Sequence, residues 1–347
     1  EYKAMFERQA PQADQPKTML PTDPKNIWME GIGLIGLGAN AKAASIAGDL
    51  VVQNARVRAI GEDAGGFRPI SEKDLFDCEY WSLEQAKLGK GAPPKFQGKV
   101  VMITGGSGTI GFAIAEAFSK LGAQTILVDK DEIALKESVT KLGVGHKYFP
   151  IDVTHSDAAN QALLAAINNF GGLDILISNA GAAHAGPMLD ISNEELRNAF
   201  ELNFFSHYSF STEAAKILKD QNRGGQILFN ISKQAVNPGK NFGAYGLPKA
   251  TTFFLMRQLA LELGSDGIRV NGINADRIRS GLLTDDFISS RAKSRGVSES
   301  EYMAGNLLNK EVTAEHVADA FTALACAEST TGHVMTVDGG NIEASLR

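Results

Sequence analysis

The chain has 347 residues, of which 44% are hydrophobic and 21% are charged, a composition that allows a large buried core. Its formal net charge of −6 comes from 34 basic and 40 acidic residues without a long basic run, which argues against a nucleic-acid partner. Only two cysteines occur, so neither a disulfide framework nor a CxxC metal-binding spacing is possible. These features predict a globular protein of the reducing cytoplasm.

The sequence opens without a charged stretch followed by an apolar run, so we expect neither a signal peptide nor a transit peptide. Residues 31–52 form the most apolar window, but Asn40, Lys42, Asp49 and several glycines interrupt it. A membrane-spanning helix needs about 20 predominantly apolar residues in a row. The chain is therefore predicted to have no membrane span.

Three kinds of segment are expected before residue 100. Four prolines among polar residues in 1–26 indicate an extended lead-in. The Ala-rich residues 39–55 predict a helix, and residues 71–89 predict another, with Ser71 as its cap and acidic residues in its first turn. Residues 89–99 combine Gly, Pro and Lys with little apolar content, and we interpret them as a linker.

From residue 97 onward, short apolar runs alternate with segments long enough for crossover helices. This alternation predicts an α/β protein with a Rossmann-type, doubly wound, parallel seven-stranded sheet and helices on both of its faces. A smaller N-terminal segment precedes it. The expected strands lie in residues 99–104, 123–129, 146–152, 173–180, 225–232, 268–274 and 333–338.

Two glycine-rich stretches have a spacing that can hold a dinucleotide, "EGIGLIGLG" at 30–38 and "TGGSGTIG" at 104–111. A nucleotide site needs a strand before the glycines, a helix after them, and a second strand that ends in an acidic residue. The first stretch is followed by polar, glycine-broken sequence, whereas the second has all three elements and leads to Asp129. We therefore predict a structural turn at 30–38 and one nucleotide site at 104–111.

The second stretch also indicates which cofactor is preferred. Gly105 and its neighbours let backbone N–H groups approach a pyrophosphate, whose charge is favourable at a helix N-terminus. Asp129 can accept hydrogen bonds from both hydroxyls of the adenosine ribose and would repel a 2′-phosphate, so we expect NAD rather than NADP. Lys130 is a competing signal, because a basic residue there can help to bind a 2′-phosphate.

A serine, a tyrosine and a lysine form the candidate catalytic group. In "YGLPK", Tyr245 and Lys249 are four residues apart at the start of a helical pattern, hence on one helix face. Ser232 ends an expected strand, at the carboxyl edge of the sheet, where open parallel sheets bind ligands.

These residues, together with "TGGSGTIG", "NAG" at 179–181, "DV" at 152–153 and Asn203 in "ELNFF", resemble the classical short-chain dehydrogenase/reductase family over about residues 97–347. Two positions depart from the family pattern. Thr109 stands where the family usually has a glycine, and Ala275 and Asp276 replace its usual Pro-Gly after the sixth strand.

The resemblance implies that Tyr245 is the acid/base for the substrate hydroxyl and that Ser232 holds the substrate oxygen. It implies that Lys249 binds the nicotinamide ribose and lowers the pKa of the tyrosine, and that Asn203 supports a water-linked proton path. Hydride would pass to C4 of the nicotinamide, without a metal. The implied cofactor-binding residues are Gly105, Ser107, Thr109, Ile110, Asp129, Asp152, Val153, Asn179, Gly181, Tyr245 and Lys249.

A narrower resemblance comes from "FDCEYWSLEQAKLG", "SKQAVNPG" and "NADRIRSGLLTDD". They look like bifunctional proteins that fuse a class II aldolase-like domain to a C-terminal short-chain dehydrogenase, of the rhamnulose-phosphate aldolase/lactaldehyde dehydrogenase type. In this reading residues 1–96 are the tail of the aldolase domain plus a linker, without an active site. Such aldolases hold a divalent metal largely through histidines, and residues 1–96 contain none.

Further residues are candidates for substrate contact. Arg277 and Arg279 alternate in a segment expected to be extended, so both are predicted to face the pocket as a clamp for an anionic substrate, with Asp276 opposite. The alternative is pairing with nearby acids or with the cofactor pyrophosphate. Residues 284–308 are charged and helical in pattern, typical of a lid or of a solvated helical excursion. His184 either faces the substrate or lies on a surface loop.

The sequence thus predicts an NAD-dependent oxidoreductase that transfers hydride between NAD and a small alcohol, polyol, sugar or hydroxyaldehyde derivative by a Ser-Tyr-Lys mechanism. Two alternatives stay open: a superfamily epimerase or dehydratase with tightly bound NAD, and a non-catalytic NAD-binding scaffold. The helices before Ser232 and after Tyr245 carry apolar residues on more than one face. Because the family commonly pairs these helices between subunits, we expect a homo-tetramer or homodimer.

Overall fold

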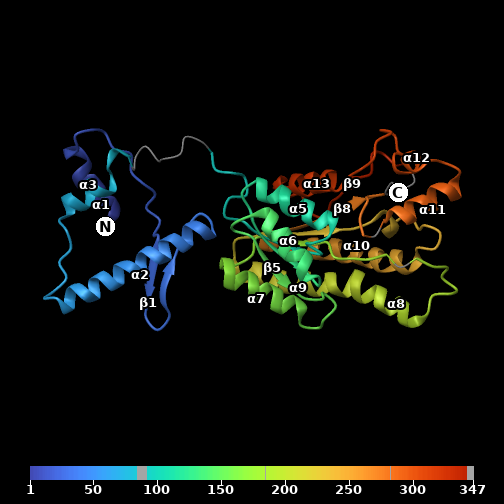
Figure 1. Cartoon of the computed structure of the whole chain (residues 1–347), viewed down its shortest axis with the longest axis horizontal. Helices are drawn as coiled ribbons and strands as arrows, with labels where there is room; N and C mark the ends of the chain where they lie inside the picture. The colour runs from blue at the N-terminus through green and yellow to red at the C-terminus, as the bar shows by residue number, and fades with distance from the viewer. Residues whose placement is uncertain (84–91, 184, 282, 342–347) are drawn as a thin grey trace. The chain divides into compact units, whose positions relative to one another are not determined.

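The chain divides into two compact units, Glu1–Pro94 and Lys95–Arg347 (Figure 1). Among the residues that the structure describes, no helix combines the length and the apolar character that crossing a bilayer requires. Parts of the helix predicted over 71–89 and of the linker predicted over 89–99 lie outside the described residues. This computed structural model describes residues 1–83, 92–183, 185–281 and 283–341.

The N-terminal unit begins with helix α1 (Tyr2–Gln9), which packs against helix α3 (Glu72–Glu79). Met5, Phe76 and Tyr80 form the buried centre of this contact. The prediction of an extended lead-in is wrong for these first residues, because the apolar side chains of α1 recur at helical spacing and the aromatic rings of the α3 region cover them.

Both predicted helices of this unit begin at capping residues. The Ser71 side chain accepts a hydrogen bond from the backbone N–H of Asp74 at 3.1 Å, as predicted for the start of α3. Helix α2 (Ala41–Asp63) follows Asn40, which caps it in the same way. This helix runs further than the predicted residues 39–55, because its helical apolar spacing continues beyond them.

The first glycine stretch lies in an antiparallel hairpin of strands β1 (Asn26–Met29) and β2 (Gly33–Gly36). Gly31 and Gly33 have positive φ angles of 74° and 119°, which turn the chain between the strands. A Cβ on Gly36 would lie 2.2 Å from the Ala44 carbonyl oxygen of α2, so glycine is required there for close packing. The predicted structural turn is confirmed.

The C-terminal unit is built on one seven-stranded, all-parallel sheet with the strand order β5-β4-β3-β6-β7-β8-β9. The order reverses between β3 and β6, which is the switch point where doubly wound sheets bind ligands. The predicted fold class is confirmed. The strands are β3 (Val100–Thr104), β4 (Gln124–Asp129), β5 (Lys147–Pro150), β6 (Ile175–Ser178), β7 (Gly225–Asn230), β8 (Ile268–Ala275) and β9 (Val334–Val337).

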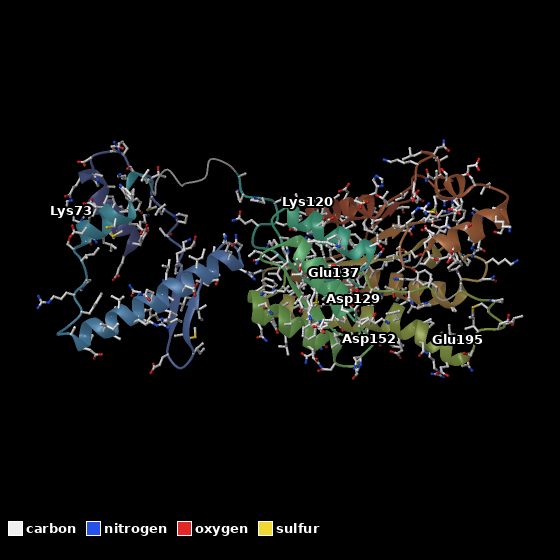
Figure 2. All side chains as sticks on the ribbon, viewed as in Figure 1. Lys73, Lys120, Asp129, Glu137, Asp152 and Glu195 are labelled. Atoms are coloured by element: carbon white, nitrogen blue, oxygen red, sulfur yellow. The ribbon has the colours of Figure 1, made fainter. Side chains whose placement is uncertain are left out.

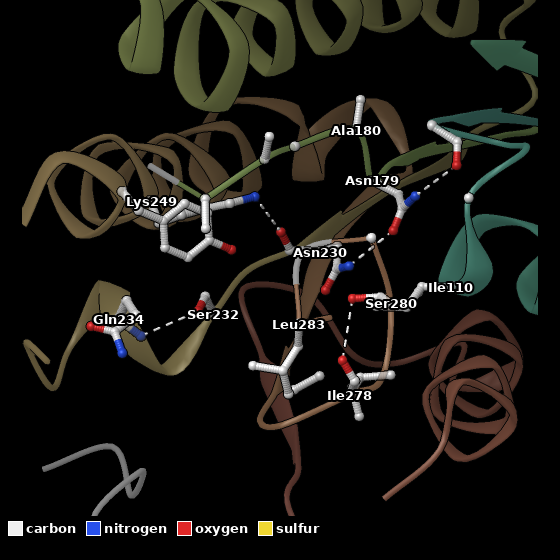
Figure 3. Close-up of a pocket in the computed structure, with 18 of the residues that line it drawn as sticks. Ile110, Asn179, Ala180, Asn230, Ser232, Gln234, Lys249, Ile278, Ser280 and Leu283 are labelled. Carbon is white, nitrogen blue, oxygen red and sulfur yellow. Dashed lines mark hydrogen bonds between the residues drawn. The ribbon is translucent and has the colours of Figure 1, made fainter. Parts of the chain in front are cut away.

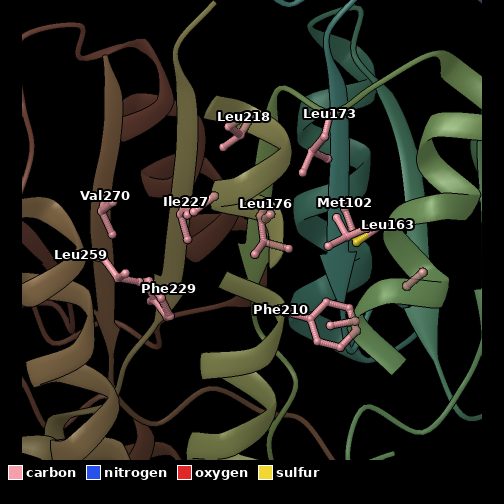
Figure 4. Close-up of a cluster of buried hydrophobic side chains, with 14 of the residues drawn as sticks. Met102, Leu163, Leu173, Leu176, Phe210, Leu218, Ile227, Phe229, Leu259 and Val270 are labelled. Carbon is pink, nitrogen blue, oxygen red and sulfur yellow. The ribbon is translucent and has the colours of Figure 1, made fainter. Parts of the chain in front are cut away.

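Helices cover both faces of this sheet (Figure 1). On one face α7, α9 and α10 pack over Met102, which belongs to the core cluster shown in Figure 4. On the other face α5, α6 and α13 pack over Val101 and Ile103, because successive side chains of β3 point to opposite faces. The helices are α5 (Thr109–Lys120), α6 (Glu132–Leu142), α7 (Ala158–Phe170), α8 (Asn193–Phe200), α9 (Ser206–Gln221), α10 (Gly243–Leu263), α11 (Asp285–Arg295), α12 (Glu299–Met303) and α13 (Ala314–Cys326).

Candidate active site

A cavity of about 890 Å³ opens at the carboxyl ends of the strands in the C-terminal unit. Figure 3 shows part of its wall. Of the predicted site residues, Ser107 and Asn203 are not among those that line it. The lining includes Gly105, Thr109, Ile110, Asp129, Asp152, Val153, Asn179, Gly181, Ser232, Tyr245 and Lys249.

The second glycine stretch makes a tight turn between β3 and α5. Gly105 has a positive φ of 64°. A Cβ on Gly111 would lie only 2.1 Å from the Gly105 carbonyl oxygen, so the first turn of α5 approaches the loop too closely for any side chain. Thr109, which departs from the family pattern, is the first residue of α5. The loop and the helix N-terminus therefore form a cradle suited to a phosphate.

Asp129 ends β4 and is held in place by the glycine loop. Its carboxylate accepts hydrogen bonds from the Ser107 hydroxyl at 2.7 Å, the Ser107 backbone N–H at 3.3 Å and the Lys130 backbone N–H at 2.8 Å. Asp152 follows the neighbouring strand β5 (Figure 2). Hydrogen bonds from the backbone and the hydroxyl of Thr154 lower the pKa of Asp152. Ser107 thus acts behind the cavity wall by fixing Asp129.

Asn179 connects the ends of three strands beside the cavity. Its side-chain N–H donates to the Thr104 carbonyl oxygen at 3.0 Å, and its side-chain oxygen accepts from Asn230 at 2.9 Å (Figure 3). Gly181 follows, and a Cβ there would lie 2.8 Å from Oδ1 of Asn203 and 3.5 Å from Nζ of Lys249. Glycine at this position keeps the approach to the lysine open.

Ser232 and Tyr245 both line the cavity, and their side chains form a hydrogen bond. Ser232 follows β7, and its hydroxyl accepts a hydrogen bond from the Gln234 backbone N–H at 3.2 Å. Tyr245 lies in the first turn of α10. Burial raises the pKa of Tyr245 to about 12, and a hydrogen bond with Ser232 acts in the opposite direction.

Lys249 lies one turn after the tyrosine and is 2% exposed, so its ammonium group depends on protein acceptors. Nζ donates to the Asn230 carbonyl oxygen at 3.1 Å, the contact drawn in Figure 3. Burial lowers the pKa of Lys249 to about 7. The pKa of Tyr245 is therefore shifted in the direction opposite to the one that the family resemblance implies, because burial outweighs the hydrogen bond with Ser232.

Asn203 lies behind Gly181 in a short π-helical segment, Glu201–Phe205, between α8 and α9. Its Nδ2 donates to the carbonyl oxygens of Ala182 and Ala199 at 3.0 and 3.1 Å. Its Oδ1 is buried and has no hydrogen-bond partner among the described residues. A free acceptor of this kind, next to the lysine, is suited to an ordered water.

His207 is a buried residue of the site that sequence reasoning missed. Its Nδ1 lies 2.6 Å from the Ser178 hydroxyl oxygen, and its Nε2 lies 3.5 Å from Nζ of Lys249. Burial, and secondly the charge of Lys249, lower the pKa of His207 well below its usual range. The one available signal was its position four residues after Asn203, on the same helical face.

The predicted arginine clamp is wrong for Arg279. Arg277 lines the cavity with a positive φ of 52°, so the segment is not extended and side chains do not alternate as predicted. Arg279 instead bonds to Asp285 and Glu311, each at 2.7 Å, and is not among the lining residues. Asp276, predicted to point away, lines the cavity and pairs with Lys233 at 2.9 Å.

The segment predicted over 284–308 contains α11 and α12. Phe287, Arg291 and Tyr302 of these helices line the cavity, so the segment forms part of its wall rather than a solvated excursion. His184 lies outside the described residues. Within the described ranges, no three His, Cys, Asp or Glu side chains come together as a metal site.

Two family models match the chain. The model described as enoyl-(acyl carrier protein) reductase matches residues 106–341, and the model described as aldolase class II, second domain, matches residues 1–88.

Among curated relatives, the uncharacterized oxidoreductase YuxG of Bacillus subtilis is 32% identical over 98% of this chain; the chain spans only 51% of that protein. Glucose 1-dehydrogenase of Gluconobacter oxydans is 30% identical and matches 71% of this chain and 92% of its own length.

The chain is also similar to solved structures of reductases. L-sorbose reductase from Gluconobacter frateurii, complexed with NADPH and L-sorbose, has a TM-score of 0.66 and 28% identity over 72% of this chain and 98% of that one. A 3-ketoacyl-(acyl-carrier-protein) reductase from Brucella melitensis, complexed with NADH, has a TM-score of 0.65 and 25% identity over 70% of this chain and 98% of that one. The motifs, the fold and these matches agree: the chain belongs to the short-chain dehydrogenase/reductase family.

Proposed function

We propose that this oxidoreductase uses NAD to move hydride to or from the hydroxyl-bearing carbon of a small alcohol, polyol, sugar or hydroxyaldehyde derivative. One observation carries the proposal. Ser232, Tyr245 and Lys249 line a cavity that also includes the glycine loop and Asp129. A non-catalytic scaffold would not need the first three residues beside a nucleotide site.

The residues present fit a nicotinamide dinucleotide. The cradle formed by Gly105 and the start of α5 suits the pyrophosphate, and a side chain at Gly111 would force the glycine loop and the helix apart. The carboxylate of Asp129 suits the adenosine ribose and would repel a 2′-phosphate at close range, which favours NAD. The names of the similar structures include both NADH and NADPH, so the choice rests on Asp129. When bound, the nicotinamide supplies the hydride acceptor or donor.

The catalytic roles follow from chemistry and position. Ser232 would hold the substrate hydroxyl by a hydrogen bond, and Tyr245 would take its proton during oxidation. As it stands, the Tyr245 hydroxyl is rarely ionised at neutral pH, so little of the phenolate base is present, because burial raises its pKa to about 12. Positive charge placed nearby, by the ammonium of Lys249 or an oxidised nicotinamide, would lower that pKa toward the working range. Asn203 would support water that carries the proton onward.

We propose no active site for residues 1–96, which would form the tail of an aldolase-like domain and a linker. The residues 1–88 match the family model of such a domain, yet these residues contain no histidine to hold a catalytic divalent metal. Residues 97–347 would then carry the whole dehydrogenase site.

We also propose a homo-tetramer or homodimer that buries the outer faces of α9 and α10. Tyr208 on α9 is exposed, and on α10 Phe254 and Leu261 are 66% and 81% exposed, unusually high for large apolar side chains on packed helices. Light scattering at micromolar concentration tests this, and a monomeric mass contradicts it.

The experiment for the activity is a screen of the purified chain against alcohols, polyols, sugars and hydroxyaldehydes with NAD and with NADP, followed by absorbance of the reduced nicotinamide. The proposal expects turnover with NAD and its loss in Tyr245→Phe. Tight NAD binding with isomerised or dehydrated product but no net reduction would indicate an epimerase or dehydratase. Binding without any turnover would indicate a scaffold.

A further inference from the structure

We propose that the substrate carries an oxyanion, a phosphate or a carboxylate, and that Arg277, Arg291 and Arg295 bind it. This inference rests on the proposed function, because it describes the substrate of the same cavity. It starts from the side chains that the loop after β8 and helix α11 bring to the cavity wall.

Helix α11 contributes two of the three arginines. Arg291 and Arg295 are four residues apart, hence on one face of the helix, and both line the cavity. The guanidinium carbon of Arg291 lies 5.2 Å from the ring centroids of both Phe242 and Phe287. Phe242 is three residues before Tyr245, so Arg291 lies on the side of the cavity that holds the candidate acid/base.

The ring of Tyr302 contacts the guanidinium groups of both Arg277 and Arg295. The guanidinium carbon of Arg277 lies 4.8 Å from the ring centroid of Tyr302, and that of Arg295 lies 5.2 Å from the same centroid. Arg277 is further fixed because its Nη1 donates to the Tyr302 carbonyl oxygen at 2.8 Å. Rings that stack on guanidinium groups hold them in place before a ligand arrives, which reduces the entropy lost on binding.

The positive charge around these arginines is not balanced by the nearby acids. One carboxylate, Asp276, is shared by two cations: it forms ion pairs with Lys233 at 2.9 Å and with Nε of Arg277 at 3.6 Å. That Nε is buried without a hydrogen-bond partner among the described residues. In the described part of the chain, no ion pair is recorded for Arg291 or Arg295.

Two further carboxylates nearby in the sequence are already engaged. Asp285 bonds to Arg279 on the outside of the cavity, and Glu301 accepts hydrogen bonds from Ser298 at the start of α12. Like charges gathered at a cavity wall repel one another, and an anion relieves that repulsion. Guanidinium groups also match the paired oxygens of phosphates and carboxylates. The arrangement therefore favours a substrate that carries an anionic group.

The test measures anion binding directly, on the full chain saturated with NADH. Inorganic phosphate and acetate are titrated by calorimetry into the wild type, the double variant Arg291→Gln/Arg295→Gln and the control Arg279→Gln, whose arginine faces outward. We expect the double variant to weaken binding of at least one of the two anions by about tenfold or more, as for the loss of a charge-assisted hydrogen bond. The control should match the wild type, and the anion bound more tightly identifies the group.

Other outcomes separate the two proposals. The anion site is overturned if the wild type and the double variant bind the anions with equal affinity. It is also overturned if the wild type binds neither phosphate nor acetate. A parallel fall in NADH affinity in the double variant also overturns it, because the arginines would then serve the cofactor. If NADH itself does not bind, the proposed function fails, and the same titration of the cofactor-free proteins still decides whether these arginines bind an anion. Arg291→Lys, which keeps the charge, guards against a folding defect and should retain part of the affinity.

A kinetic comparison gives an independent reading. For a polyol and its monophosphate, the double variant should lower the ratio of kcat/KM for the phosphorylated member to kcat/KM for the neutral member by about tenfold or more. Equal losses on both members would contradict an anion-specific role.

Discussion

The two units of this chain use similar glycine spacings for different purposes. In the N-terminal unit, Gly31 and Gly33 turn a β-hairpin, and Gly36 allows α2 to pack closely. In the C-terminal unit, Gly105 and Gly111 shape a strand-to-helix turn that faces a cavity. Glycine spacing therefore indicates only where the backbone needs room. The elements on either side decide whether that room serves packing or a ligand.

The units also differ in how completely their helices are buried. In α2, Val51 is the only buried residue of 23, whereas Ile46, Leu50 and Ile60 are exposed. In α13, seven of 13 residues are buried, and the helix packs against α5 and the sheet. Burial of apolar surface is the main stabilising contribution to folding, so the C-terminal unit has the larger share of it. A site that must hold charged groups in fixed positions depends on such a packed support.

The largest expected effect comes from removing the hydroxyl of Tyr245, compared with removing a tyrosine hydroxyl in the N-terminal unit. Tyr245→Phe should lower turnover by about 10³-fold, because it deletes the proposed acid/base, and should leave NAD affinity nearly unchanged since the ring stays. Tyr80→Phe removes a buried hydroxyl that bonds to Tyr2 in the N-terminal unit, and should leave turnover unchanged. Steady-state kinetics and NAD titration check both. Near-normal turnover in Tyr245→Phe would mean that the acid/base is misassigned.

The second comparison places one methyl group in each glycine stretch. Gly111→Ala puts a Cβ against the Gly105 carbonyl oxygen and should weaken NAD binding by about 100-fold, because the phosphate cradle must open. Gly33→Ala meets no atom within 4 Å, but its positive φ should cost about 1–3 kcal/mol of stability in the hairpin. Calorimetry should then show normal NAD affinity for Gly33→Ala. A loss of NAD affinity in that variant would break the contrast between the two stretches.

A third change addresses cofactor choice within the C-terminal unit. Asp129→Ser removes the carboxylate that would repel a 2′-phosphate, so NADP affinity should rise and NAD affinity should fall, each by about tenfold. Asp131→Asn is the matched control, because Asp131 caps α6 and does not line the cavity. Titration of both cofactors checks the result. Tighter binding of NADP than NAD by the wild type would overturn the assignment of NAD.

The sequence predicted the features that depend on local pattern or on family motifs. The parallel sheet was predicted from apolar runs such as residues 99–104. The glycine loop was recognised from the strand before it and the helix after it. The orientation of Arg279 was mispredicted, because the extended backbone assumed for it is broken by the positive φ of Arg277. α1 was missed because prolines in the same segment outweighed its short apolar pattern. His207 was missed because its contact with Lys249 joins residues 42 positions apart and exists only in the folded chain.

The smallest expected effect concerns the contact between His207 and Lys249. A lysine ammonium has three N–H donors. The Asn230 carbonyl oxygen accepts one of them at 3.1 Å. In the tautomer with its proton on Nδ1, His207 accepts a second at Nε2, 3.5 Å away, which leaves one for the cavity. His207→Phe removes one acceptor and should lower turnover by about tenfold, as for the loss of a hydrogen bond to a charged group. His207→Gln keeps an acceptor near the position of Nε2 and should recover most of that loss.

The pH profile distinguishes this positioning role from simple packing. Lys249 has a pKa lowered by burial to about 7, and an acceptor for its ammonium opposes that lowering. Without the acceptor, the pKa falls further and the ammonium is lost at lower pH, so the alkaline limb of kcat/KM should move to lower pH in His207→Phe. Tyr245 is the other titratable group recorded against Lys249, and it is unchanged in both variants. If the alkaline limb stays in place while only the melting temperature falls, His207 supports the fold and does not position the lysine.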